Sequence, residues 1–302
     1  MIMKRNVKSI TLFKNDLIQL SHPGSGNTEK GYKYSYTEMD NHDNVILEIK
    51  YDPSGRIEEK YVFRFDNKGN LLEEISYLTE NEIAEHKTYE WDEQNKIVRS
   101  FKLYADDSKD RVDYRYDQQG RVIEKTTVDS DNEIEATEIM EWKENLLLKK
   151  QIHEFGEMVL EEKNEYDEEG KLTQNIKWTS EEGKTTIEYH YDEKKQLIKT
   201  LTYDNNDKLI NKTRYLYNEA GKVIQADFES ARNKNSTIIT YDDRGNAIEQ
   251  TETNEQGEIN NRALRKFNEY GDVIETSVNI DFHGQGINQE YILNYEYEYF
   301  ES

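Results

Sequence analysis

The chain has 302 residues, of which 40 are Lys or Arg and 63 are Asp or Glu, for a formal net charge of −23 at pH 7. Because an acidic surface repels phosphate groups, we expect neither nucleic acid nor an anionic membrane surface as a partner. The sequence contains no cysteine, which excludes disulfides, thiolate metal sites and cysteine nucleophiles. No apolar run approaches the about 18 residues of a membrane span. The N-terminus lacks a signal-peptide pattern, so we expect a protein that is cytoplasmic, or exported without a cleaved signal and without membrane insertion.

Residues 1–31 are predicted to form an N-terminal cap segment. Lysine and arginine outnumber acidic residues there, in contrast to the rest of the chain. Weak strand patterns occur at Ile10–Phe13 and Leu17–Leu20, and a loop follows at His22–Asn27. Repeat arrays generally need such a terminal cap to cover the end unit.

Residues 32–302 are predicted to form an array of about ten tandem repeats of about 25 residues each. The marker of each repeat is one aromatic or large apolar residue, first at Met39 and last at Phe267, which Asp or Asn follows in most copies. A fixed period over this many copies indicates one small structural unit stacked in series.

Turn chemistry divides each repeat into two strands. The marker residue precedes an Asp-x-x-Gly sequence, as at Asp117–Gly120, in which Asp can bond its own backbone and Gly accepts positive φ. An apolar pair such as Val122 and Ile123 opens the next strand, and regular alternation predicts one of these side chains on each face of the sheet. A looser turn such as Asp204–Asp207 follows midway through the repeat. Each repeat is therefore predicted to be a β-hairpin.

These elements predict an all-β fold. Short turns favour an antiparallel meander of hairpins, whereas the rival arrangement is a solenoid with one repeat per layer. Because twist accumulates and open sheets beyond about ten strands curl or split, we expect a long, twisted and curled antiparallel sheet, as an open spiral or partial shell. The final strand, Tyr295–Tyr299, alternates Tyr with Glu, and its glutamates should discourage edge-to-edge pairing.

Several copies of the repeat carry a family likeness. The runs Tyr51–Ile57, Phe65–Leu71, Tyr116–Glu124 and Tyr241–Ala247 resemble the YD repeat of bacterial RHS proteins, and the likeness covers roughly residues 32–300. In that family, β-hairpin strips spiral into a hollow shell that encloses a C-terminal toxin or presents a ligand-binding surface. The chain is short for a closed cage and shows neither the family's C-terminal core segment nor a toxin domain. The resemblance therefore implies a repeat scaffold linked to bacterial toxin or competition systems, without a catalytic site.

No motif in the sequence indicates chemistry. The six histidines form neither HxH nor HExxH, and the Asp turns offer too few oxygens in calcium-loop order. Gly24–Gly26 and Gly284–Gly286 lack the residues of a phosphate-binding loop or a nucleophile elbow, so we interpret both as connectors. We expect no enzyme activity, no cofactor and no catalytic, cofactor-binding or metal-binding residues.

The aromatic residues of the repeat have two interpretations. The first is packing, because rings at strand spacing bury area between neighbours. The second is a binding ladder, because each Tyr offers an apolar ring and a polar tip. The candidate residues are Phe65, Trp91, Tyr116, Trp142, Tyr166, Tyr191, Tyr217, Tyr241 and Phe267.

The sequence favours a non-enzymatic bacterial scaffold that binds a protein partner. An immunity or chaperone-like role toward a basic toxin or effector fits the charge, since an acidic surface speeds the capture of a cationic partner. The alternative is a carbohydrate-binding module of the cell envelope or a secreted protein.

Overall fold

The computed structural model describes residues 6–17, 31–104, 106, 108–282 and 287–301. The described residues form 22 β-strands and no helix, so the prediction of an all-β chain is confirmed, and no segment among them qualifies as a membrane-spanning helix. The chain divides into two compact units: Met1–His86 with Asn235–Ser302, called here the first unit, and Lys87–Lys234, called the second. The predicted strand at Leu17–Leu20, beyond its first residue, and the loop at His22–Asn27 lie outside the described residues.

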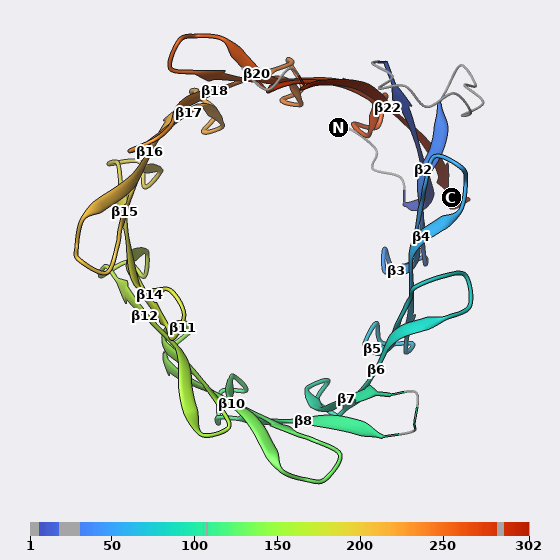
Figure 1. Cartoon of the computed structure of the whole chain (residues 1–302), viewed down its shortest axis with the longest axis vertical. Coiled ribbons are helices and arrows are strands. Elements are labelled where there is room, and N and C mark those ends of the chain that lie inside the picture. The colour runs from blue at the N-terminus through green and yellow to red at the C-terminus, as the bar shows by residue number, and fades with distance from the viewer. Residues whose placement is uncertain (1–5, 18–30, 105, 107, 283–286, 302) are drawn as a thin grey trace. The chain divides into compact units, whose positions relative to one another are not determined.

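The first unit is an antiparallel sheet. Its strands pair in the order β18, β19, β20, β21, β22, β1, β2, β3, β4 and β5. Figure 1 shows the blue N-terminal strands beside the red β22. The strands are β1 (Val7–Asp16), β2 (Tyr32–Met39), β3 (Val45–Tyr51), β4 (Ile57–Phe65), β5 (Leu71–Tyr77), β19 (Ala247–Asn254), β20 (Ile259–Phe267), β21 (Val273–Phe282) and β22 (Ile287–Tyr299).

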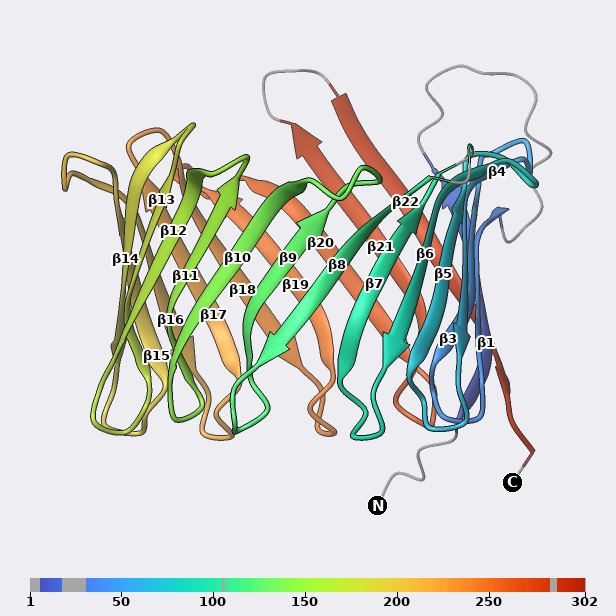
Figure 2. The same cartoon turned by 90° about the horizontal axis from the view of Figure 1, so that it is seen from below.

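The second unit is an antiparallel meander in which each strand from β7 to β16 pairs with the next along the chain (Figure 2). The meander prediction is confirmed, and the solenoid is excluded. The chain passes between the units within β6 (Ile83–Trp91) and at the start of β18 (Lys234–Tyr241). The strands are β7 (Ile97–Leu103), β8 (Lys109–Tyr116), β9 (Val122–Val128), β10 (Ile134–Lys143), β11 (Leu146–Glu154), β12 (Glu157–Tyr166), β13 (Leu172–Thr179), β14 (Gly183–Tyr191), β15 (Leu197–Tyr203), β16 (Leu209–Tyr217) and β17 (Val223–Ser230).

The prediction of an open spiral or partial shell is wrong, because the first and last strands are joined. β1 pairs with β2 on one side and with β22 on the other, from Val7 opposite Tyr299 to Asp16 opposite Tyr291, with one register shift between Val7 and Ser9. The first and last strands of the array are therefore hydrogen-bonded to each other, and neither is a free edge. The physical reason is that a free edge leaves a row of unpaired N–H and C=O groups, which this pairing satisfies. The glutamates of β22 do not prevent the pairing: the Ser9 hydroxyl donates to Glu298 Oε2 at 3.2 Å.

The Asp-x-x-Gly turns have the predicted chemistry. In the turn after β8, the Gly120 N–H donates to the Asp117 carbonyl at 3.0 Å, with φ +81° at Gly120. Asp117 Oδ1 accepts the N–H groups of Gln119 and Arg121, each at 2.9 Å. We call these turns, which follow the marker residues, the repeat turns, and the others the midway turns. The midway turns that begin at Asp52, Asp129 and Asp204 use the same carboxylate bonds.

The apolar pairs after the repeat turns do not alternate as predicted. The strand register shifts at each of them: Tyr116 lies opposite Val122, Arg115 lies opposite Glu124, and Ile123 is left over as a β-bulge. A bulge places two residues opposite one and interrupts the period of two. The regular alternation on which the prediction of one apolar side chain per face rests is therefore interrupted. The same shift occurs at the repeat turns before β3, β5, β11, β13, β15, β17, β19 and β21.

The sheet has almost no buried core. Among the described residues, the buried apolar side chains are those of Ile75 and Val128. The chain exposes 19945 Å², whereas a compact monomer of its mass would expose about 13,300 Å². Backbone ladders, turns and cross-strand contacts therefore carry more of the stability than an apolar interior does.

We expect acid to destabilise the protein through its turns. Hydrogen bonds from the N–H groups of Asn70, Lys171 and Asn246 hold the pKa of Asp66, Asp167 and Asp242, respectively, below the ordinary 3.8. A pKa that is lower in the folded state means that the stabilisation is complete above pH 3.8 and is lost as the pH falls through the folded value.

The measurement for this prediction is the melting temperature as a function of pH between about 5 and about 2. The control replaces the same three residues with Asn, which accepts the same turn bonds without titrating, as Asn268 does from Tyr270 and Asp272. The triple variant should show a shallower decline below pH 4 than the unmodified protein. Identical declines in both proteins would contradict the prediction.

Candidate functional site

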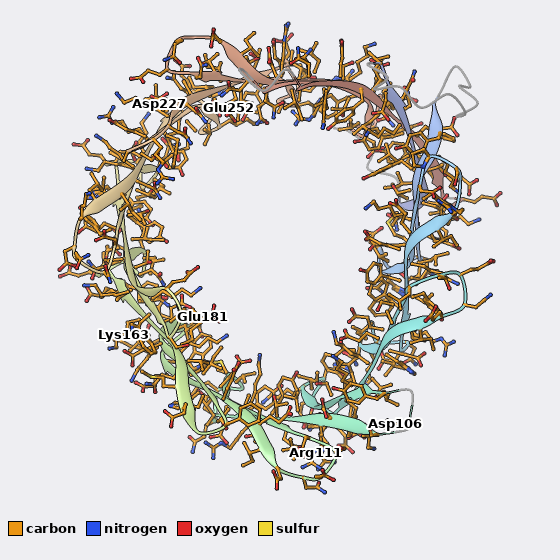
Figure 3. The ribbon with its side chains drawn as sticks, viewed as in Figure 1. Asp106, Arg111, Lys163, Glu181, Asp227 and Glu252 are labelled. Carbon is orange, nitrogen blue, oxygen red and sulfur yellow. The ribbon has the colours of Figure 1, made fainter. Side chains whose placement is uncertain are left out.

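The candidate aromatic residues lie at strand ends, directly before repeat turns, and all nine are half-buried. The second unit is curved, and Figure 3 shows Arg111 and Lys163 on its convex side. Tyr116 and Tyr166 lie an odd number of residues from these two on the same strands and therefore face the concave side. We call this side of the second unit the aromatic face. It brings together one marker aromatic for every two strands.

The polar tips of these aromatics connect successive repeats. Each donates to a carbonyl at the start of the strand that follows the previous repeat turn, from the first strand residue in four cases and from the second, Leu147, in one. The bonds are Tyr116 Oη to Ile97 O at 2.7 Å, Trp142 Nε1 to Val122 O at 2.8 Å, Tyr166 Oη to Leu147 O at 2.9 Å, Tyr191 Oη to Leu172 O at 2.9 Å and Tyr217 Oη to Leu197 O at 2.7 Å.

These repeat-bridging hydrogen bonds give the marker aromatics a structural role. Burial also raises the pKa of the tyrosines that make them, so the donating form persists well into the alkaline range. Cations also lie over three of the rings: Lys96 over Tyr116 at 5.2 Å, Arg121 over Trp142 at 5.9 Å and Lys171 over Tyr191 at 4.8 Å from the ring centroid. A role as a binding ladder therefore stays a prediction.

On both strand faces of the second unit, many acidic side chains are paired with nearby lysines. On the aromatic face, Glu138 Oε2 lies 3.0 Å from Lys150 Nζ and 3.6 Å from Lys125 Nζ. On the convex side, Glu161 lies 3.3 Å from Lys149 and 2.6 Å from Lys163. Such pairs at a solvent-accessible sheet surface contribute little stability one by one. Their consequence here is that the faces offer little net charge to a partner.

Some midway turns of the second unit are different, because they contain several carboxylates and no Lys or Arg. Figure 2 shows the turns that follow β9, β11 and β13 along the upper edge of the second unit. Residues 129–135, 154–157 and 179–183 contain no Lys or Arg, although Lys184 follows the last of these directly. Among the described residues, none of the carboxylates in these three stretches takes part in an ion pair. The carboxylates are Asp129, Asp131, Glu133, Glu135, Glu154, Glu157, Glu181 and Glu182.

Exposed apolar side chains gather at midway turns as well. Of the fifteen large apolar side chains that are exposed among the described residues, eight lie in a midway turn or within two residues of one. Three others occupy bulge positions after repeat turns. The eight are Leu78, Ile83 and Ile259 in the first unit and Tyr104, Ile134, Phe155, Leu209 and Ile210 in the second.

Phe155 is the most exposed of these, at 78%. It occupies a two-residue hairpin turn with Gly156, where φ is +48° at Phe155 and +87° at Gly156. Turns with two positive φ values strongly favour Asn-Gly or Asp-Gly, so a phenylalanine here is held in an unfavourable conformation. Phe155 is not among the candidate residues predicted from the sequence. The signal was present in Glu154–Glu157, a hairpin turn with Phe where turn chemistry calls for Asn.

The remaining sequence predictions about chemistry stay open. Among the described residues, no group of acidic residues and histidines has metal-binding geometry. His86 Nε2 lies 2.7 Å from Glu73, and His190 Nε2 lies 3.5 Å from Glu188. A shallow hollow of about 610 Å³ in the first unit is lined by Leu17, Leu264, Ile292 and neighbouring residues. His22, His283 and both glycine connectors lie outside the described residues.

Comparisons with known proteins define no family. No family model and no curated protein matches the chain. A solved structure of TcdB2–TccC3 without its hypervariable C-terminal region is 11% identical with a TM-score of 0.36, covering 92% of this chain and 19% of that one. The Photorhabdus luminescens Tc holotoxin pore is 11% identical with a TM-score of 0.34, covering 89% and 19%.

A porin-like protein from Bacteroides uniformis is 8% identical with a TM-score of 0.33, covering 97% of this chain and 98% of that one. The chain thus spans about a fifth of the length of the toxin chains that it matches. At these TM-scores the likeness assigns no function.

Proposed function

We propose that this chain is a non-enzymatic β-repeat scaffold that binds a protein partner through the midway turns of its second unit. The observation that carries the proposal is that exposed apolar side chains lie beside carboxylates without ion pairs in the turns after β9 and β11, while many charges on the strand faces are paired. Exposed apolar groups rimmed by polar residues are typical of protein interaction sites. The YD-like motifs of the sequence support a place among bacterial RHS-type repeat proteins, with an immunity or chaperone-like role toward a toxin or effector.

The test compares capture of proteins from the native host by the unmodified chain and by a variant of the midway turns. The variant carries Ile134→Thr, Phe155→Asn, Leu209→Thr and Ile210→Thr, which remove the apolar side chains and keep turn-compatible residues. The control variant carries Ile198→Thr and Leu216→Thr, two exposed apolar residues outside the midway turns. Capture should be followed by cross-linking and identification of the bound protein.

We expect one host protein to be retained by the unmodified chain and the control variant and to be lost from the midway variant. Equal capture by all three, or no specific capture by any, would overturn the proposal. The carbohydrate alternative has one supporting feature: over β14–β17 the aromatic face is uncharged, with Tyr189 opposite Thr200 and Tyr215 opposite Ala226. Glycan binding that Tyr215→Ala abolishes and the midway variant retains would support that alternative instead.

A further inference from the structure

We infer that Ile134 and Phe155 form the anchor of the interaction surface and receive a cationic, amphipathic protein segment, one with an apolar side chain between lysines or arginines. The inference rests on the proposed function and adds the position of the site and the chemistry of its partner. The geometry, the charge and the conformation of Phe155 each contribute to it.

The two apolar side chains come from neighbouring turns. The Phe155 N–H donates to the Glu135 carbonyl at 2.7 Å, which extends the β10–β11 ladder into the β11–β12 turn. Ile134, the residue before that acceptor, is 60% exposed, and Phe155 is 78% exposed. Aromatic residues with a rigid, exposed ring dominate the energetics of many interfaces. Ile134 and Phe155 are therefore both exposed at the same end of the β10–β11 hairpin, on hydrogen-bonded stretches of backbone.

The charge around this pair selects the partner. Asp131, Glu133, Glu154 and Glu157 lie in the two turns that carry the apolar residues, and all four are exposed. No cation in these turns offsets their mutual repulsion. A segment with lysine or arginine on both sides of an apolar residue would neutralise the carboxylates while its apolar residue covers the anchor. An anionic or uncharged apolar segment would leave the repulsion in place.

A role in binding would explain why an aromatic residue occupies the unfavourable turn conformation of Phe155. Asn at this position would suit the positive φ better and would leave no apolar ring exposed to solvent. Retaining Phe therefore sacrifices local stability for an aromatic ring in solvent. This feature also provides a substitution that removes the anchor without endangering the fold, Phe155→Asn.

The experiment measures binding of labelled peptides by fluorescence anisotropy, with a helical Leu/Lys peptide of about 14 residues as the probe. Comparison peptides replace every Lys with Glu, or every Leu with Ser. The protein variants are Phe155→Asn, the charge variant Asp131→Asn with Glu154→Gln and Glu157→Gln, and a control with Glu193→Gln and Glu219→Gln in repeat turns. Melting curves accompany each variant.

We expect the Leu/Lys peptide to bind and both comparison peptides to bind at least about tenfold more weakly. Phe155→Asn should weaken binding about tenfold while leaving the melting temperature unchanged or higher. The charge variant should weaken binding and flatten its dependence on salt between about 50 and about 300 mM, whereas the repeat-turn control should not.

Equal binding of the Leu/Lys and Leu/Glu peptides, or equal binding by Phe155→Asn and unmodified protein, would overturn the inference. This failure is distinguishable from failure of the proposed function. If the midway variant loses its host protein but the peptides do not discriminate by charge, the scaffold function stands and the cationic partner is wrong. If the midway variant keeps its host protein, the proposed function itself is wrong.

Discussion

Replacing Gly31 with alanine is expected to destabilise the protein by about 3 kcal/mol or more. Gly31 has φ +84°, and an added Cβ would lie 2.2 Å from the Lys14 carbonyl oxygen and 2.8 Å from the Asn15 nitrogen. Both are backbone atoms of β1, so no side chain can rotate to make room. Because Lys14 pairs with Tyr32 of β2 and Leu293 of β22, the displacement would act on both ladders of β1.

The matched control for this prediction is Gly55→Ala. Gly55 has the same φ of +84° but no atom within 4 Å of an added Cβ. Its substitution should therefore cost only the conformational term, about 1 kcal/mol. Urea midpoints of both variants, with hydrogen exchange of the β1 and β22 amides, provide the measurement. Equal destabilisation by the two substitutions would show that β1 is not held against this glycine.

Removing three repeat-bridging hydroxyls at once, by Tyr166→Phe, Tyr191→Phe and Tyr217→Phe, is expected to lower the free energy of unfolding by about 3 kcal/mol in total. Each substitution keeps the ring and leaves one carbonyl, at Leu147, Leu172 or Leu197, without this donor. The cost of about 1 kcal/mol per bond should be nearly additive, because the three bonds share no partner.

Tyr215→Phe serves as the control for the triple variant. Tyr215 lies on the same face and strand as Tyr217, two residues earlier, and its hydroxyl makes no hydrogen bond among the described residues. Its substitution should change stability by less than about 0.5 kcal/mol. Denaturant titration of the single and triple variants provides the comparison. A triple variant as stable as the control would mean that solvent satisfies these carbonyls equally well.

The turns could be predicted from the sequence because each turn depends on residues within about four positions of one another. The Asp117–Gly120 turn needs a carboxylate that bonds the backbone within four residues and a glycine with positive φ, and both are visible in the letters. The hairpin meander follows from such turns at short, regular spacing. The position of Phe155 in a turn was equally local, but an aromatic residue there departs from turn preferences and so escaped the pattern.

The features that the sequence did not reveal depend on partners or on register. The Val122–Ile123 pair looks like the start of a regular strand, and only the hydrogen-bond register across from Tyr116 identifies a bulge. The pairing of β1 with β22 joins residues such as Ser9 and Glu298, 289 positions apart. No local pattern in β1 or β22 identifies the other strand as its partner. The cost of a free sheet edge favours some pairing, but it does not specify which strand pairs with β1.

The joining of β1 to β22 also constrains the order of assembly during synthesis. β1 leaves the ribosome before any other strand of the array, yet one of its two partners is the last to be made. Neighbouring hairpins can form as they emerge, because their loops are short, whereas the pairing of β1 with β22 has to await the synthesis of all the strands between them. Until then the nascent chain carries an unsatisfied edge on β1, which makes this strand the point at which premature association between growing chains would begin.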